Sequence, residues 1–560
     1  MTQETEAGIN GLELNLEELL VVGEEEVNGV RMKVYKNRMK TLRDLLAFST
    51  AMFGDQECMV YQDQRFTFQE FGRLVKSAGK VLQDLGVRQG DRVAMILGNA
   101  TAFPIVFFAT ASIGAISVPL NCWWKSEELE YGLSDSGSSV LVMDPKYWDS
   151  ISQIKDNLPA LKHIFVTGDE EITGTLPFST LLAEPDAPMC EEPISEQDVA
   201  SIFYTSGTTG RPKGAMTMHM NFITNVYNAA SGILSAAPPP GSTDEESMEA
   251  ARKQLLTVPM FHVTGCHSQL VTSIALGGTL VILRRFRADE AMEAIEKEKV
   301  SAMVGVPTMY IMMLDSPNFD KYDLSSLTSA SYGGAPAPPD MVKRLHEAFP
   351  QLSLGNSYGL TETSSITTLL RGEDAIRKPD SVGKPAPVVE IKTVDLAGND
   401  LPANEVGEIL IKGPNIIKGY WNKSEATAET IIDGWLHTGD IGRIDEEGFL
   451  YVVDRQKDMI LRGGENIYCV EIEDVLYEHP KVLEAAVIGV PDKTFGEQVK
   501  AIIYLRRDQE AKAEEIQEFC EQRLAHFKVP QYVAFIDSPL PRNPQGKVLK
   551  AELKQKFVKT

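Results

Sequence analysis

Short apolar runs alternate with helix-like segments between about residues 50 and 310. The runs RVAMIL, AISVPL and SVLVMD are rich in β-branched residues, and the segments Ala102–Ile113 and KSEELEYGLSDSG between them have helical patterns. Strands separated by helices in this way are typical of βαβ units and predict a mainly parallel sheet. Three later runs, QLLTVP, GGTLVIL and VSAMVGVP, continue the same pattern.

A charge-free run from Val93 to Trp124 is the membrane candidate of this sequence. Pro104, Gly114 and Asn121 interrupt it, and turn signals divide it into a helix-like and a strand-like piece. Neither piece has the continuous apolar length of a membrane span. The pattern therefore predicts a buried α/β layer.

The pattern changes after about residue 387. Short strands and glycine turns follow up to Val453, as in EIKTVD, GEILIKG and GRIDEEGFLYVV, and they indicate a small antiparallel unit. Beyond DRQKD, the runs EAAVIGVPD and KAIIYL are separated by helical segments and predict an α+β lid. The polar, proline-rich segment SAAPPPGSTDEESMEAARK is expected to form a surface loop that runs into a short helix.

The predicted fold is therefore α/β. A large N-terminal domain is built of mainly parallel α/β subdomains and a small β-barrel-like unit, and a small mobile α+β domain follows it. The length of 560 residues fits two to four domains, each with its own core.

Composition narrows the function classes. A net charge of −25 argues against non-specific nucleic-acid binding, which needs a basic face. Six widely spaced cysteines without a CxxC pair, and the lack of a signal-peptide pattern, favour a reducing cytoplasm. The histidines show no zinc-ligand spacing, so any metal is expected to arrive with the substrate.

The segment YTSGTTGRPKGA follows an apolar strand and is typical of a phosphate-binding loop. Its glycines allow backbone N–H groups to point at an anion, and Lys213 adds a positive charge. It does not match G-x4-G-K-[ST], so it is not a Walker A loop. The candidate phosphate ligands are Thr205, Ser206, Gly207, Thr208, Thr209 and Lys213.

Six motifs occur in the order typical of the adenylate-forming enzymes. They are YTSGTTGRPKGA, YGGAPAP, NSYGLTET, GWLHTGD, DRQKDMILRGGENIYCVEIE and PRNPQGKVLK. The chain resembles the acyl-CoA synthetases of that superfamily. The resemblance implies that ATP and a carboxylic acid form acyl-AMP and pyrophosphate, after which coenzyme A takes the acyl group, with Mg²⁺ travelling with ATP.

The resemblance also implies roles for individual residues. Thr361 would bond the phosphates, and Glu362, with Thr205 as a second oxygen ligand, would hold Mg²⁺. The adenine would lie against Gly334, Ala335 and Pro336 with Tyr358 stacked on the base, and Asp440 and Arg455 would hold the ribose.

Two further residues complete the implied site. Lys547 would reach the α-phosphate and the attacking carboxylate. His262, in PMFHVTGCHS, would be an aromatic gate beside the acyl pocket, whose floor depends on Val263, Tyr332, Gly334 and Ser357. A proton-transfer role for His262 is not expected.

The resemblance also predicts a domain rotation between the two half-reactions. Residues 1–456 would form the N-terminal adenylate-forming domain and 457–560 the mobile lid, with the hinge at Lys457. In the second pose RGGEN would approach the site, and Gly463 and Gly464 would let the pantetheine arm of coenzyme A pass. RGGEN is also compatible with a plain β-hairpin turn.

The identity of the acid is left open. A medium- or long-chain fatty acid is the first expectation, and short branched, sulfur-containing or coumarate-like aryl acids are the alternatives. A luciferase-like enzyme, a carrier-protein ligase and a catalytically inactive nucleotide-binding protein are also considered. Peripheral membrane contact and homodimer formation are left open, and neither nucleic acid nor a transmembrane segment is expected.

Overall fold

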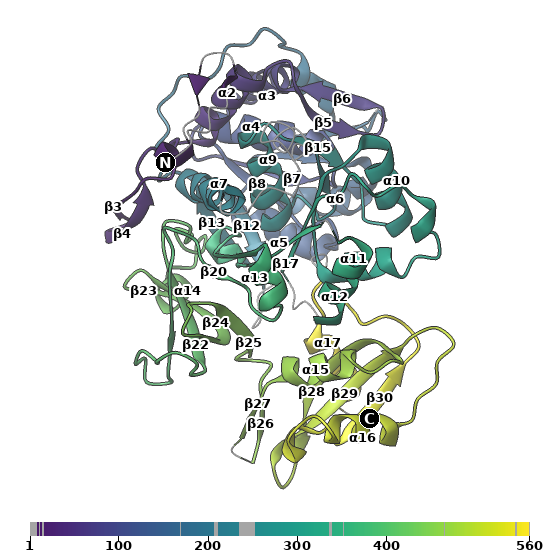
Figure 1. The fold of residues 1–560 in the computed structure, drawn as a ribbon. Helices are drawn as coiled ribbons and strands as arrows, with labels where there is room; N and C mark the ends of the chain where they lie inside the picture. Colours follow the sequence, from purple (N-terminus) through teal and green to yellow (C-terminus); the bar gives the residue numbers. More distant parts are fainter. Residues whose placement is uncertain are drawn as a thin grey trace.

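The computed structural model describes residues 8–9, 12–13, 16–168, 170–205, 211–234, 253–334, 339–350, 352–463, 465–543 and 546–558. Two large sheets with their helices form most of the chain, a small antiparallel sheet lies beside them, and a separate C-terminal domain, called the lid below, ends the chain (Figure 1). The loop and short helix predicted for SAAPPPGSTDEESMEAARK fall in 235–252 and lie outside the described residues. The predicted α/β class with a smaller α+β C-terminal domain is confirmed.

The first sheet has seven strands, and all its pairs are parallel except the last one. Its order is β11 (Leu176–Pro177), β10 (His163–Val166), β9 (Val140–Met143), β7 (Arg92–Ile96), β8 (Ile116–Pro119), β12 (Val199–Thr205) and β13 (Lys213–Met218). The helices along this part are α2 (Leu42–Phe53), α3 (Phe68–Asp84), α4 (Ala102–Ser112), α5 (Ser126–Ser136), α6 (Trp148–Ile154) and α7 (His219–Leu234).

The second sheet has nine strands, parallel in its centre and antiparallel at both edges. Its order is β20 (Lys384–Pro385), β19 (Thr368–Arg371), β18 (Ser353–Tyr358), β17 (Ser329–Gly333), β16 (Ala302–Gly305), β14 (Lys253–Leu256), β15 (Thr279–Ile282), β5 (Glu57–Tyr61) and β6 (Gln64–Thr67). The helical elements along it are the π-helix η4 (Thr264–Val271), α9 (Thr272–Ala275), α10 (Ala288–Glu298), α11 (Pro307–Leu314), α12 (Pro339–Ala348) and α13 (Glu373–Arg377).

Helix α4 is buried along its whole length, as expected of the charge-free run. It contacts α2 and α3, and Phe107 packs against Phe222 of α7 with ring centroids 5.6 Å apart. One apolar cluster joins α4 to strands of both large sheets, for example Met95 of β7 and Leu280 of β15. Among the described residues, no helix is long and apolar enough to cross a membrane.

The N-terminal segment belongs to the body of the protein. Strands β3 (Val22–Val27) and β4 (Val30–Tyr35) form a hairpin whose apolar side packs on Met220 of α7. The buried guanidinium of Arg38 pairs with Glu25 at 2.6 Å and with Glu196 at 2.9 Å. The acidic residues of GEEEV therefore include a structural ion-pair partner.

The predicted small antiparallel unit is present. Its strands are β21 (Glu390–Val394), β22 (Gly407–Lys412), β24 (Trp435–Ile444), β23 (Ile431–Ile432) and β25 (Leu450–Arg455), with α14 (Ser424–Thr430) between β22 and β23. The lid has a sheet of β27 (Glu465–Ile467), β26 (Ile460–Arg462), β29 (Gly496–Leu505), β28 (Val482–Asp492) and β30 (Tyr532–Ile536), packed with α15 (Cys469–Tyr477), α16 (Ala513–Glu521) and α17 (Lys550–Phe557).

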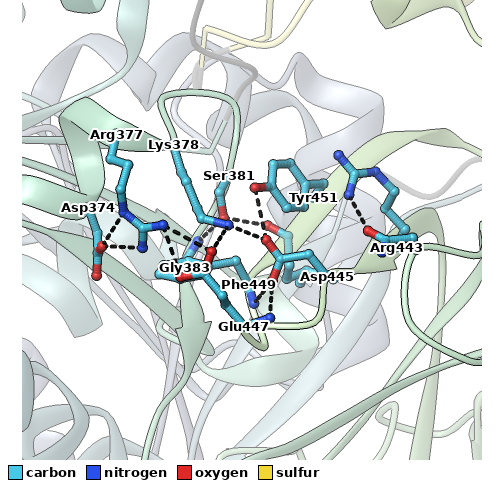
Figure 2. A network of polar contacts seen from close by, with 12 residues as sticks. Asp374, Arg377, Lys378, Ser381, Gly383, Arg443, Asp445, Glu447, Phe449 and Tyr451 are labelled. Carbon is cyan, nitrogen blue, oxygen red and sulfur yellow. Dashed lines mark hydrogen bonds and ion pairs between the residues drawn. The ribbon is translucent and has the colours of Figure 1, made fainter.

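A network of ion pairs ties the small sheet to the nine-stranded sheet (Figure 2). Lys378, which follows α13, contacts Asp445 and Glu447 in the turn between β24 and β25. Asp445 also accepts hydrogen bonds from the backbone N–H of Phe449 and the hydroxyl of Tyr451. Although burial opposes ionisation of Asp445, these partners lower its pKa to about 2. The network therefore fixes the turn that precedes β25.

We expect Lys378→Met to lower the thermal midpoint of the protein by several degrees, because Asp445 would lose its cation while the side chain stays nearly buried, at 8% exposure. The neighbouring Arg377 is a matched control. Its side chain is 48% exposed and its pairs with Asp374 and Glu447 lie at the surface, so Arg377→Met should change little. Equal midpoints for the two variants, measured by calorimetry, would contradict the expectation.

Candidate active site

The centre of the site is a buried carboxylate at the junction of β18, β24 and β25. The hydroxyl of Tyr358 donates to Oδ2 of Asp440 at 2.7 Å, and Nε of Arg455 lies 3.1 Å from Oδ1. Asp440 and Arg455 face each other in the register of β24 and β25. Burial, followed by the charge of Asp440, raises the pKa of Tyr358 well above its usual value, so Tyr358 stays a hydrogen-bond donor.

This junction lies at the carboxyl ends of parallel strands. Strands β16, β17 and β18 are parallel neighbours and end at Gly305, Gly333 and Tyr358. The carboxyl ends of strands in open α/β sheets are the usual place for ligands. The fold therefore directs the predicted residues to one edge.

The lid brings Lys547 to the same place. The loop before it packs on the start of α11, because a Cβ placed on Gly546 would lie 2.9 Å from Cγ2 of Val306. Burial, followed by repulsion from Arg455, lowers the pKa of Lys547 to about 7, and Asp440 opposes this shift. Lys547 is therefore within electrostatic reach of Asp440 and Arg455 although more than ninety residues of chain separate it from them.

The predicted phosphate loop connects β12 to β13. Thr205 and Lys213 are opposite each other in this antiparallel pair, and the hydroxyl of Thr205 donates to the carbonyl of Lys213 at 3.4 Å. Four of the predicted ligands, Ser206, Gly207, Thr208 and Thr209, lie outside the described residues. The hairpin nevertheless fixes both ends of the loop.

Lys213 and Glu362 meet through Tyr420. The ammonium of Lys213 lies 4.8 Å from the centroid of the Tyr420 ring, and the Tyr420 hydroxyl donates to Oε1 of Glu362 at 2.8 Å. Among the described residues there is no cluster of three metal-ligating side chains. A single carboxylate fits a Mg²⁺ ion that is held mainly by phosphate oxygens and water.

The segment that carries Thr361 and Glu362 is a tight turn. It contains the short 3₁₀ helix η6 (Thr361–Thr363), whose N-cap is Leu360. A Cβ on Gly359 would lie only 1.3 Å from the carbonyl oxygen of Ser365, which excludes any side chain there. Ser364 and Ser365 have φ values of +53° and +88°, a strained geometry for non-glycine residues.

The π-helix η4 holds this turn from the other side. A ring nitrogen of His267, Nδ1, lies 2.7 Å from the hydroxyl of Ser364, and the hydroxyls of Ser268 and Ser365 are 2.6 Å apart. The His267 ring is packed between Phe203 and Phe222. Burial lowers its pKa to about 3, so the neutral imidazole supports the turn without adding charge.

His262 is partly buried beside Phe261, with ring centroids 4.7 Å apart. Burial lowers its pKa to about 3, so the ring is neutral at physiological pH. This agrees with a pocket or gate residue and not with a proton-transfer group. The gate role itself stays a prediction.

Two predictions concern the acyl pocket and the lid. Tyr332, predicted at the pocket floor, is buried in an apolar cluster on the face of β17 opposite to Ser331 and Gly333, and its pocket role stays a prediction. The prediction of a hairpin at RGGEN is confirmed by β26 and β27, and a Cβ on Gly463 would meet Phe495 of the lid.

The predicted contacts to adenine and to coenzyme A lie partly outside the described residues. Gly334 has φ +76°, and a Cβ on it would meet nothing within 4 Å. Ala335, Pro336 and Gly464 lie outside the described residues. Tyr420 and His267 were missed, because a tyrosine in IIKGYWN and a second histidine in FHVTGCHS carry no spacing signal.

Comparisons with known proteins identify the family. The AMP-binding enzyme family matches residues 46–421, and the AMP-binding enzyme C-terminal domain matches residues 471–547. A feruloyl-CoA synthase of Amycolatopsis sp is 37% identical over 491 residues, which cover 88% of this chain and 94% of that protein. A long-chain-fatty-acid–CoA ligase of Bacillus subtilis (strain 168) is 36% identical over 542 residues, which cover 92% and 94%.

Solved structures also match the chain over most of its length. The anthranilate CoA ligase AuaEII in complex with anthranoyl-AMP matches with a TM-score of 0.84 at 27% identity, covering 92% of this chain and 97% of that one. ATP-bound MatB from Rhodopseudomonas palustris matches with a TM-score of 0.81 at 28% identity, covering 92% and 99%. The chain therefore belongs to the AMP-binding enzyme family and is an AMP-forming acyl-CoA synthetase, which uses ATP, Mg²⁺ and coenzyme A.

Proposed function

We propose that the enzyme forms acyl-AMP in the pose described here and then transfers the acyl group to coenzyme A after the lid has turned. The observation that carries this proposal is the packing of Gly546 against Val306 at the start of α11, which brings Lys547 within electrostatic reach of Asp440 and Arg455. Adenylation joins two anions, and positioned cations lower the barrier by stabilising the charge on the phosphoryl oxygens.

The residues divide the work as follows. Asp440 accepts hydrogen bonds from the ribose hydroxyls, and Tyr358 and Arg455 fix the orientation of its carboxylate. Lys213, Thr205, Thr361 and the loop between β12 and β13 bind the phosphates, and Glu362 holds the Mg²⁺ ion that arrives with ATP and neutralises phosphate charge. Lys547 then bridges the α-phosphate and the attacking carboxylate.

We place the domain boundary between residues 456 and 457, with the pivot at Lys457. Strand β25 ends at Arg455 and β26 begins at Ile460, so few residues must absorb the φ/ψ change. Asp454, just before the pivot, accepts a hydrogen bond from the backbone N–H of Cys469 at the start of α15. This bond favours the adenylation pose, and rotation must break it.

For the acid we propose a medium or long chain whose tail lies between the nine-stranded sheet and the helical elements α7 and η4. The relatives carry names that include feruloyl-CoA synthase and long-chain-fatty-acid–CoA ligase, so an aryl acid is the second candidate. All six cysteines are free thiols, which supports a cytoplasmic location.

The test is coenzyme-A-dependent AMP release with saturated acids of two to eighteen carbons and with aryl acids. We expect pyrophosphate release with ATP and acid alone, and thioester formation only when coenzyme A is added. A kcat/KM optimum at medium or long chains supports the chain assignment. An optimum at ferulate or coumarate favours the aryl candidate, and no pyrophosphate release with any acid refutes the proposed reaction.

A further inference from the structure

Arg371, the last residue of β19, lies on the face of the nine-stranded sheet that is turned toward α7. In the antiparallel pair of β18 and β19, Arg371 is opposite Gly355 and Leu369 is opposite Ser357. Leu370, between them, belongs to the apolar cluster on the other face. A Cβ on Gly232 of α7 would lie 2.9 Å from Nε of Arg371, so the guanidinium reaches across to that helix.

The guanidinium has no partner in the described part of the chain. Its N–H groups donate no hydrogen bond to a described residue, and no described carboxylate lies within ion-pair distance. Burial lowers its pKa, yet the residue keeps an intermediate accessible surface. A side chain that is shielded from bulk solvent but still has accessible surface faces an internal space. A buried polar group without a hydrogen-bond partner in a native fold indicates that a partner is missing.

The same face of the sheet leaves room for a ligand. Beside Arg371, β17 and β18 present only small residues toward α7 and η4: Ser331, Gly333, Gly355 and Ser357. Ser331, Gly333 and Ser357 are partly exposed, whereas Ala330 and Tyr332 on the opposite face are buried. Helix α7 covers this region through Asn228, which donates to the carbonyl of Ile366, and η4 through Gln269, which donates to that of Val304.

The face of the sheet that carries Arg371 extends to the reacting centre. Ser357 immediately precedes Tyr358, whose hydroxyl holds Asp440, while Gly355 and Arg371 lie two residues deeper in the sheet. Two residues along a strand span about 7 Å, which matches an acid of about six to eight carbons. A carboxylate is the group that a guanidinium binds best, through two parallel hydrogen bonds.

We propose that Arg371 binds a second, distal carboxylate of the substrate, and that the preferred acids are dicarboxylic acids of medium length. The inference rests on the proposed function, since it concerns the acid that this site activates. One carboxylate is adenylated beside Lys547 while the other pairs with Arg371. A purely apolar tail would instead place its methyl end against an unpaired cation.

The experiment compares acids of equal length, adipate with hexanoate and suberate with octanoate. Binding is measured by calorimetry with a non-hydrolysable ATP analogue, and turnover by coenzyme-A-dependent AMP release. The variants are Arg371→Leu, which removes the charge, and Arg371→Lys, which keeps it. The control is Arg73→Leu, since Arg73 is exposed on α3.

For the wild type and Arg73→Leu we expect kcat/KM to favour the diacid by at least about 10-fold, and for Arg371→Leu that ratio should fall by about 100-fold, as expected on loss of a charge-assisted pair. Arg371→Lys should retain part of the preference. Arg371→Leu should unfold no earlier than the wild type, because it removes an unpaired buried cation.

The experiment distinguishes a failure of the inference from a failure of the proposed function. If hexanoate and octanoate are activated but the diacids neither bind nor react, or if Arg371→Leu leaves the ratio unchanged, the inference is wrong and the proposed function stands. If suberate binds in an Arg371-dependent manner but no acid releases pyrophosphate, the inference stands and the proposed function fails. A preference for hydroxylated aryl acids over diacids would also overturn the inference.

Discussion

Replacement of Lys547 by alanine is expected to lower acyl-AMP formation by about 100- to 1,000-fold, the usual cost of removing one positioned group that stabilises transition-state charge. Thioester formation from supplied acyl-AMP should be unchanged, because the proposed second pose withdraws Lys547 from the site. The two half-reactions are measured separately, by ATP–pyrophosphate exchange and by coenzyme-A-dependent release of AMP from acyl-AMP.

The pKa of Lys547 supplies a second readout. Without nucleotide it is lowered to about 7, chiefly by burial, so most of the lysine is neutral above pH 7. Bound phosphate stabilises the charged form and raises the pKa, so ATP binding should take up a proton at pH 7.5–8.5 and none well below pH 7. Calorimetry in buffers of different ionisation enthalpy measures this uptake, and Lys547→Ala should abolish it.

Equal loss of both half-reactions in Lys547→Ala would contradict the division of labour between the two poses. Lys556→Ala is a suitable control, since Lys556 is an exposed lysine on α17 of the same lid. It should leave both half-reactions and the proton uptake intact.

The second large effect is expected for Asp440→Asn. The change keeps the size of the side chain but removes the charge that Arg455 faces and half of the acceptor capacity available to the ribose. We expect kcat/KM for ATP to fall by about 100-fold, within the range for a buried charge pair that loses one partner. Since Asp440 also stabilises the ammonium of Lys547, the pKa of Lys547 should fall further, and adenylation should need a lower pH.

Tyr358→Phe is the matched control for Asp440→Asn. It removes the hydrogen bond that orients the carboxylate but leaves the carboxylate and its pair with Arg455 in place. Its effect on kcat/KM should be about 10-fold, the value of a single hydrogen bond to a charged group. A wild-type KM for ATP in Asp440→Asn would show that the ribose is held elsewhere.

The sequence allowed the fold to be predicted where local pattern decides it. The alternation of apolar runs and helical segments correctly indicated parallel sheets, and the charge-free run from Val93 to Trp124 became a buried layer. The face of a residue was harder to predict. The period of two in β17 places Tyr332 in an apolar cluster and leaves Ser331 and Gly333 on the other face of the strand, which the motif YGGAPAP alone did not indicate.

In the site, only residues that belong to the quoted motifs could be predicted from the sequence. The resemblance named Asp440, Arg455 and Lys547, and the structure brings them together. It could not show that Tyr420 links Lys213 to Glu362, that His267 supports the strained turn at Ser364, or that Arg371 has no partner among the described residues. These relations join elements far apart in the chain, and neither spacing nor composition records them.

The buried helix α4 determines how the enzyme can be made in the cell. Its apolar surface is covered partly by Phe222 of α7, and its neighbours include strands that are synthesised much later, such as β15 at Thr279–Ile282, which pairs with β5 near the N-terminus. A nascent chain therefore exposes an apolar helix on the ribosome until more than a hundred further residues have emerged. Translation must proceed without long pauses over that interval, or a chaperone must shield the segment until the second sheet closes over it.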